Sequence, residues 1–229
     1  MGALPIEPER LEAYMEKAMR EAKRTTNWLE PDEAHEAAVK AFCRALYEHE
    51  AFLADFEPFA DDVARAGERA ALGQLLLKLT VPGIPDVYNG DELRSLSLVD
   101  PDNRRPVDWD ARREALAAFA EGAEPDRETI KLLVIQRALA LRARRPEAFA
   151  GAYTPVDAGP EVCAFARGDG EVLVVVPVRG TSQGTTLRLP GELAGAWRDV
   201  LSGALRELSR RTQLSELTSP HGLALLERV

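Results

Sequence analysis

The stretch Pro82–Leu93, PGIPDVYNGDEL, and the loop Leu98–Trp109, LVDPDNRRPVDW, decide how this chain is interpreted. An apolar run from Leu75 to Val81 precedes them, and prolines, glycines, carboxylates, amides and arginines follow it. This pattern predicts one strand of an α/β barrel that ends in a polar loop. Barrel enzymes assemble their active sites at this end of their strands. The rest of the chain must therefore show whether the other strands are present.

The composition indicates a globular protein and excludes several classes of function. The chain has 229 residues, of which 45% are hydrophobic, and a formal net charge of −9. An acidic chain disfavours a nucleic-acid partner, because a phosphate backbone requires a concentrated basic face. The basic stretch Arg142–Arg145 is interpreted as a solvated last helical turn, with an anion site as the alternative. No apolar run approaches the roughly 20 residues that span a bilayer, so no membrane role is expected.

The cysteines and histidines predict neither a metal site nor a cofactor site. Cys43 and Cys163 are expected to be buried thiols of a reducing compartment. The three histidines have no ligand spacing with either cysteine. The amino terminus lacks a basic start followed by an export-type apolar segment, so we expect a cytoplasmic location.

Periodicity predicts a helical region followed by a β domain. Helices are expected from Glu7 to about Leu79, with a break or kink at Pro58, and again over 110–121 and 127–145. After Phe149 short β-prone runs begin, and strands are expected over 162–166, 172–178, 185–189, 197–201 and 223–226. The strand over 172–178 is apolar on both faces and is expected to be central.

The predicted fold class is α+β in several parts. A helical subdomain is expected over 1–75, the final strand and helices of a (β/α)8 barrel over 76–149, and a small antiparallel β-sandwich-like domain over 150–229. A whole barrel needs about 250 residues and eight strands alternating with helices. With one convincing barrel strand, the chain is too short to hold a complete barrel.

Several segments resemble one family in the same order along the chain. They are GALPIEPERLEAYMEKAMREAK, PDEAHEAAVKAF, FLADFEPF, PGIPDVYNGDEL, SLVDPDNRRPVDW, ALALRARRPEAFAGAY and LALLERV. Together they resemble the carboxy-terminal third of the maltooligosyl trehalose synthases, which belong to the α-amylase superfamily. The resemblance implies isomerisation of the reducing-end α-1,4 bond of a maltooligosaccharide to an α,α-1,1 bond, in trehalose biosynthesis.

The same resemblance implies that the catalytic acids lie elsewhere. A retaining mechanism needs two carboxyl groups about 5 to 5.5 Å apart. In the family an aspartate nucleophile, a glutamate acid/base and a second aspartate lie on the fourth, fifth and seventh strands, upstream of anything that resembles this chain. We therefore expect no catalytic residue here, no cofactor and no isomerase activity of the chain alone.

Four residues of the opening motif are candidates for substrate contact or for orienting the acids: Tyr88, Asn89, Asp91 and Glu92. The alternative is that glycines and prolines shape the turn while Glu92 pairs with an arginine. Asp86 is expected to be buried and paired.

Other candidates lie outside the motif. Arg104 and Arg105 can hold sugar hydroxyls or barrel carboxylates, or clamp their loop to the domain beneath. Trp28 can stack on a glucose ring or pack in the core, and Thr25 and Asn27 beside it depart from the H-T-S-W of the family. Trp197 is expected in the core of the β domain, and Trp109 is expected to pack the loop.

Three functional classes remain open for the chain. It is the carboxy-terminal part of such an isomerase, a non-catalytic α-glucan-binding module, or an interaction subunit of a split amylase-family enzyme. The expected partners are a maltooligosaccharide and the missing amino-terminal barrel portion. Self-association is also expected if no partner is present, because the missing strands would leave an apolar flank around Leu75–Val81 unpaired.

Overall fold

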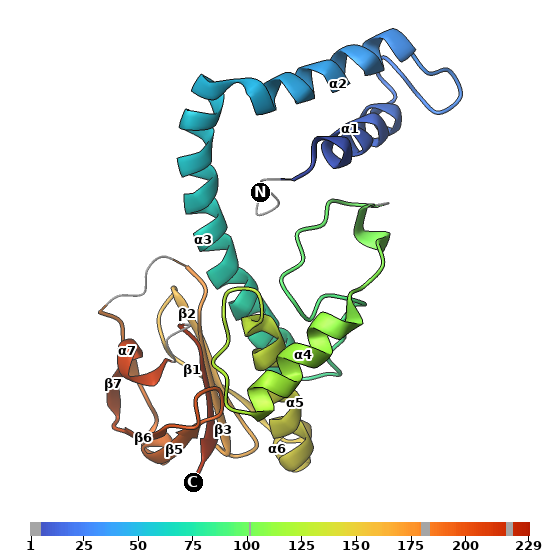
Figure 1. The fold of residues 1–229 in the computed structure, drawn as a ribbon. Helices are drawn as coiled ribbons and strands as arrows, with labels where there is room; N and C mark the ends of the chain where they lie inside the picture. Colours follow the sequence, from blue (N-terminus) through green and yellow to red (C-terminus); the bar gives the residue numbers. More distant parts are fainter. Residues whose placement is uncertain (1–5, 101, 180–183, 219–221) are drawn as a thin grey trace. The chain divides into compact units, whose positions relative to one another are not determined.

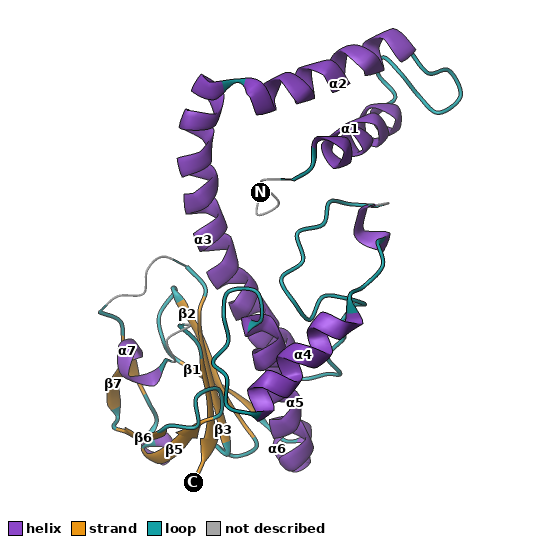
Figure 2. Cartoon of the chain, viewed as in Figure 1, coloured by secondary structure: helices purple, strands orange, loops and turns teal. Residues whose placement is uncertain are grey.

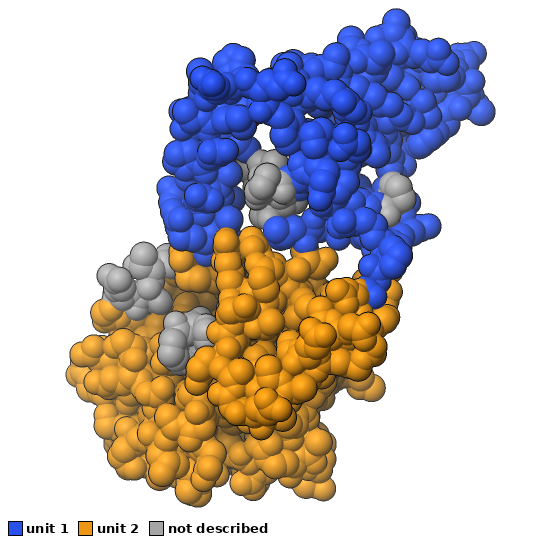
Figure 3. All heavy atoms as spheres, in the orientation of Figure 1, with its two compact units in different colours: residues 1–67, 96–107 blue, residues 68–95, 108–229 orange. Residues whose placement is uncertain are grey.

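A computed structural model describes residues 6–100, 102–179, 184–218 and 222–229 (Figure 1). Its contacts divide the chain into two compact units, which are coloured separately in Figure 3. Unit 1 comprises residues 1–67 and 96–107, and unit 2 comprises residues 68–95 and 108–229. The two boundaries predicted near residues 75 and 149 stay predictions.

Unit 1 is helical. It contains α1 (Pro8–Ala22), α2 (Glu33–Glu48), the first part of α3 (Glu50–Thr80) and the short 3₁₀ helix η1 (Asp102–Arg104). The start of α2 follows from local chemistry, because the Asp32 carboxylate accepts the His35 amide at 2.9 Å and caps the free end of the helix. The expected break or kink at Pro58 does not end the helix, since α3 continues through this residue.

The helices of unit 2 are the end of α3, α4 (Trp109–Ala120), α5 (Ile130–Arg144) and α6 (Pro146–Ala150). The helix expected as far as about Leu79 is confirmed, because α3 continues to Thr80 and so contains most of the apolar run Leu75–Val81. Leu72, Leu75, Leu76 and Leu79 recur at helical spacing and are buried in one core cluster with α5. The run therefore offers no exposed apolar flank for self-association.

No strand precedes Tyr153 in the described part of the chain. Residues 84–88 of the opening motif lie in irregular structure. A barrel strand requires hydrogen-bonded neighbours, and the described segments place none beside this one. The α+β class itself, a helical region followed by an antiparallel β domain, is confirmed.

The strands of the β domain are drawn in orange in Figure 2. Its strands are β1 (Tyr153–Val156), β2 (Val162–Arg167), β3 (Val172–Pro177), β4 (Thr186–Arg188), β5 (Gly195–Asp199), β6 (Leu205–Leu208), β7 (Arg211–Gln213) and β8 (Ala224–Arg228). Two short helices, η2 (Gly191–Leu193) and α7 (Leu214–Leu217), join them. Six strands form one sheet in the order β1-β2-β3-β8-β5-β6, and β4 pairs with β7 in a second sheet. All the pairings are antiparallel.

The central strand β3 is buried on both faces, as its sequence predicts. Val174 and Val176 belong to a core shared with α3 and α5, whereas Leu173 and Val175 belong to a core shared with the second sheet. The helix approaches the sheet closely at Gly73, where an added Cβ would lie 2.8 Å from Val176 Cγ1. Glycine is required here because only a residue without a side chain permits that distance.

The tryptophan and cysteine expectations have mixed outcomes. Trp197 is fully buried, and its indole nitrogen donates to the Leu193 carbonyl at 3.1 Å, so its core role is confirmed. Cys43 is a buried free thiol, and Cys163 is a free thiol that is only partly buried. Burial raises the pKa of both thiols. Among the described helices, none is long and apolar enough to cross a membrane.

The core of unit 2 gives the first prediction. Leu76→Ala removes a side chain that is fully buried between α5 and the sheet, so it should lower the free energy of unfolding by about 2 to 4 kcal/mol. Leu205→Ala is the matched control, because Leu205 is 70% exposed in the same unit and its loss should cost less than about 0.5 kcal/mol. Urea unfolding followed by circular dichroism measures both variants. Equal losses in the two variants would contradict the assignment of this core.

Candidate functional site

A tight turn presents two of the candidate residues to solvent. The Asp91 amide donates to the Tyr88 carbonyl at 2.8 Å, and Gly90 has φ +89°. A glycine at the third position of a type II turn adopts this conformation without strain. Tyr88 is 62% exposed, and no described residue hydrogen-bonds the side chain of Asn89. The turn therefore leaves the Tyr88 hydroxyl and the Asn89 amide available to a ligand.

The carboxylate of Glu92 is held by an arginine of α4. Arg112 Nε lies 2.9 Å from Glu92 Oε2, and the same guanidinium donates to the carbonyls of Gly90 and Asp108. Its Cζ lies 5.7 Å from the Trp109 ring centroid. One planar guanidinium thus fixes the turn to the start of α4, which a single-point cation such as lysine cannot do. Sequence analysis gave an ion pair between Glu92 and an arginine as the alternative to substrate contact, and Arg112 forms this ion pair.

Asp91 is also engaged, with lysines on two helices. Lys131 Nζ of α5 lies 2.6 Å from Asp91 Oδ1, and Lys78 Nζ of α3 lies 3.9 Å from Asp91 Oδ2. Asp91 and Glu92 therefore anchor the motif, while the side chains of Tyr88 and Asn89 are not bound by any described residue. Asp86 is exposed, so its expected burial is wrong.

In unit 1 the loop with the arginine pair is held by a different arginine. Arg10 of α1 grips Asp102 with two hydrogen bonds, Nε to Oδ1 at 2.9 Å and Nη2 to Oδ2 at 2.8 Å. The Leu98 amide also donates to Asp102, at 2.7 Å. The hydrogen bonds from Arg10 lower the pKa of Asp102 below its ordinary value. Asp102 therefore stays ionised and ties the loop to α1.

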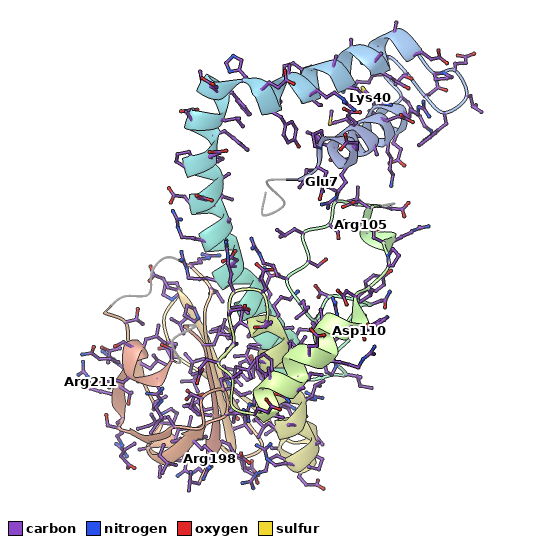
Figure 4. All side chains as sticks on the ribbon, in the orientation of Figure 1. Glu7, Lys40, Arg105, Asp110, Arg198 and Arg211 are labelled. Atoms are coloured by element: carbon purple, nitrogen blue, oxygen red, sulfur yellow. The ribbon has the colours of Figure 1, made fainter. Side chains whose placement is uncertain are left out.

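The adjacent arginines of this loop are mostly exposed. Arg104 pairs with Asp100, four residues earlier, and Arg105, labelled in Figure 4, donates from Nε to the Asp102 carbonyl at 3.1 Å. Both pairings lie within the loop itself, so their remaining guanidinium donors face solvent. Sequence analysis offered Arg104 and Arg105 as residues that hold this loop to its neighbours. Within unit 1, Arg10 holds the loop instead, through Asp102.

Trp28 lies on the loop after α1 and is 55% exposed, so the alternative that it packs in the core is wrong. Glu36 of α2 fixes this loop. Its carboxylate accepts a hydrogen bond from Thr26 Oγ1 at 2.6 Å and two hydrogen bonds from Arg20. Arg20 Cζ also lies 5.0 Å from the Trp28 ring centroid. One face of the indole is thus supported by a cation whose position is fixed by Glu36.

The candidate residues divide between the two units. Unit 2 contains Tyr88, Asn89, Asp91 and Glu92, and unit 1 contains Trp28, Arg104 and Arg105. Sequence reasoning missed the residues that position them: Arg10, Arg20, Glu36, Asp102, Arg112 and Lys131. The one local signal was the helix start at Asp108, whose carboxylate accepts the Ala111 amide at 2.9 Å and so orients α4 and its Arg112.

Comparison with known proteins identifies relatives along most of the chain. Residues 154–223 match the family model of the α-amylase C-terminal all-β domain. A putative maltooligosyl trehalose synthase of Mycobacterium tuberculosis is 42% identical over 205 residues, which is 85% of this chain and 25% of the relative.

Solved structures give the same family. The maltooligosyltrehalose synthase from Arthrobacter ramosus matches with a TM-score of 0.87 and 34% identity over 99% of this chain and 31% of its own. A hypothetical maltooligosyl trehalose synthase of Sulfolobus tokodaii matches with a TM-score of 0.77 and 27% identity over 96% of this chain and 29% of its own. The chain thus spans between a quarter and a third of the length of these relatives.

The Glu36 cluster gives a prediction about pH. The hydrogen bonds from Arg20 and Thr26 lower the pKa of Glu36 from 4.5 to about 2. Because the folded-state pKa is below the unfolded value, the stabilisation is fully present above pH 4.5 and is lost as the pH falls towards 2. Glu36→Gln should therefore destabilise unit 1 at pH 7 and weaken the dependence of its stability on pH between these values.

Urea unfolding at a series of pH values tests this expectation. Glu48→Gln is the control, because Glu48 is exposed on the same helix and no described residue pairs with it. An acid limb of the stability profile that is the same in the wild type and in both variants would show that Glu36 does not contribute.

Proposed function

We propose that this chain, which is homologous to the carboxy-terminal part of maltooligosyl trehalose synthases, serves as that part of such an enzyme. The observation that carries the proposal is structural similarity to a synthase along nearly the whole chain. The complete enzyme would convert the reducing-end α-1,4 bond of a maltooligosaccharide to an α,α-1,1 bond. The proposed partners are this glucan and an amino-terminal barrel portion, in the cytoplasm.

In this proposal the chain supplies substrate contacts and not the reacting acids. A retaining glycoside transfer needs a carboxylate nucleophile and a carboxyl acid/base about 5 to 5.5 Å apart. Asp91 and Glu92, two of the three acids of the motif, are each ion-paired to a cation of unit 2. Both carboxylates are thus already used to hold the turn against the helices of unit 2, which suits an anchoring role.

The exposed polar groups suit recognition of sugar hydroxyls. The Tyr88 hydroxyl both donates and accepts, and the Asn89 amide offers the same two functions one residue later. Trp28 offers an aromatic face that is backed by Arg20. Arg104 and Arg105 offer planar donors for hydroxyls or for carboxylates of the barrel portion.

A second candidate function is glucan binding without chemistry. The exposed ring of Trp28 favours it, because aromatic faces commonly stack on apolar faces of sugar rings. Calorimetry with maltoheptaose separates the two candidates: a binding module retains affinity as the isolated chain, whereas a part of a larger enzyme binds weakly or not at all.

Activity of the isolated chain is the direct test of the main proposal. The purified chain should form no trehalosyl product from maltopentaose, because the nucleophile and the acid/base are supplied by another part of the enzyme. A chimera of the Arthrobacter ramosus synthase, with its matched 31% replaced by this chain, should form the product. Product formed by the chain alone, or a chimera that is folded but inactive, would contradict the proposal.

Tyr88 is tested within the same chimera. Tyr88→Phe removes one hydroxyl from an exposed side chain, so kcat/KM should fall about three- to tenfold, the value of one hydrogen bond, while the melting temperature stays unchanged. Tyr153→Phe is the control, because Tyr153 is a partly exposed tyrosine of β1 outside the motif. Equal kinetics in the two variants would remove Tyr88 from the site.

A further inference from the structure

The first part of α3, which belongs to unit 1, carries an apolar face that no described core covers. Phe52, Phe56, Phe59 and Val63 follow one another at intervals of four, three and four residues, which places them on one side of the helix. We call these four residues the α3 stripe. None of them belongs to either hydrophobic core cluster of the described residues, and Phe59 is 52% exposed. The α3 stripe is thus an apolar face without a complete cover.

The three rings of the stripe contact one another. The centroids of Phe52 and Phe56 are 5.1 Å apart with an interplanar angle of 12°, and those of Phe56 and Phe59 are 6.4 Å apart. Each ring restricts the movement of its neighbour, so little side-chain freedom is lost when a partner covers them. Phenylalanine is also enriched in the cores of protein–protein interfaces. The stripe therefore has the composition and the order of a docking face.

Carboxylates surround this face. Residues 50–64 contain five acids and no lysine, arginine or histidine: Glu50, Asp55, Glu57, Asp61 and Asp62. All five are exposed. At about 100° per residue they lie on both sides of the stripe and opposite it. Among them, Asp62 pairs with Arg65, and no described residue forms an ion pair with the other four. The rim of the stripe thus carries an excess of negative charge.

We propose that the α3 stripe docks into an apolar groove, rimmed by lysine or arginine, on the amino-terminal portion of the enzyme. An amphipathic helix that enters a groove uses anchors at this spacing, and its flanking charges select a rim of opposite sign. The proposal rests on the proposed function, which supplies the partner. The Arthrobacter ramosus synthase has that partner within its own chain, because the segment matched here is 31% of it.

The same charges disfavour two other occupants. A second copy of the chain would bring two acidic helices together, and opposed like charges weaken such a contact. A helix that lies on a membrane surface carries lysine and arginine beside its apolar face, because these residues are attracted to anionic headgroups. Residues 50–64 contain neither. A protein groove with a basic rim matches both the aromatic rings and the acids.

Hydrogen exchange of residues 50–63 tests the docking, in the isolated chain and in the chimera with the Arthrobacter ramosus synthase. These amides should exchange about tenfold more slowly in the chimera, because a docked helix opens less often than one with few tertiary contacts. A smaller graft gives a second measurement: residues 50–63 alone replace the matched segment of that synthase and should be protected likewise. Equal exchange in the isolated chain and in both grafted enzymes would overturn the proposal.

Phe59→Ser identifies the anchor. Serine and phenylalanine have similar helix propensities, so exchange in the isolated chain should change by less than about threefold. In the chimera the same substitution should remove most of the tenfold protection, because an interface anchor is lost. Phe42→Ser is the matched control, since Phe42 is a 63% exposed phenylalanine of α2 in the same unit and lies outside the stripe. Equal loss of protection in the two variants would overturn the assignment of the stripe.

The basic rim is tested at Asp55, which is exposed beside the stripe. In the chimera, Asp55→Lys should reduce the protection of residues 50–63 more than Asp55→Asn does, because it places a cation against the rim. An increase in protection with Asp55→Lys would contradict a basic rim. Protection that rises with the concentration of the isolated chain would show that a second copy covers the stripe, and would also overturn the proposal.

Trehalosyl product from the chimera separates this proposal from the proposed function. An active chimera whose residues 50–63 exchange as in the isolated chain would overturn the docking face alone. A folded chimera that protects these residues but forms no product would support the docking face and contradict the proposed function.

Discussion

The burial of β3 on both faces is the constraint on which unit 2 depends. Val174 and Val176 require an apolar cover on one face, and Leu173 and Val175 require one on the other. The end of α3 and the whole of α5 provide the first cover, and the second sheet with α7 provides the other. Each face would expose several apolar side chains without its cover, at about 1.5 to 3 kcal/mol for each side chain.

The same constraint places the opening motif. Because the end of α3 and α5 lie on one face of the sheet, Arg142 of α5 donates to the Leu79 carbonyl at 3.0 Å and to the Gly83 carbonyl at 2.9 Å. The chain therefore leaves α3 in a direction set by α5. Lys131 and Arg112 then fix the next carboxylates. A packed core thus holds a polar turn through a short series of cations, and the side chains of Tyr88 and Asn89 are left unbound by the described residues.

The elements that sequence analysis predicts correctly are those with a strong period. The helices α4 and α5 and the strands β2 and β3 agree with expectation within a few residues. The strands β1, β6 and β7 were missed, because they have three or four residues each and lie largely exposed, so their alternation is too short to recognise. The opening motif was predicted to be a barrel strand, but residues 84–88 lie in irregular structure, because a β-prone run forms a strand only beside a hydrogen-bonded neighbour.

The candidate site shows a similar limit. The sequence marked the exposed residues of the motif, since turn chemistry is local. It did not reveal the cations that hold them, because Arg112 lies 20 residues from Glu92 and Arg10 lies 92 residues from Asp102. Several arginines and lysines were available at comparable spacing, and only tertiary packing selects among them. The exposure of Trp28 was missed for the same reason, since Glu36 supports its loop from the next helix.

The order of strands has a consequence for synthesis. The sheet runs β1-β2-β3-β8-β5-β6, so β8 lies between the early strands and the late pair although it is the last of them along the chain. Until residues 224–228 have left the ribosome, the β1-β2-β3 meander and the β5-β6 hairpin have no shared edge. Each half then exposes an open strand edge to other nascent chains. Loss of a few residues from this strand would accordingly divide the sheet in two.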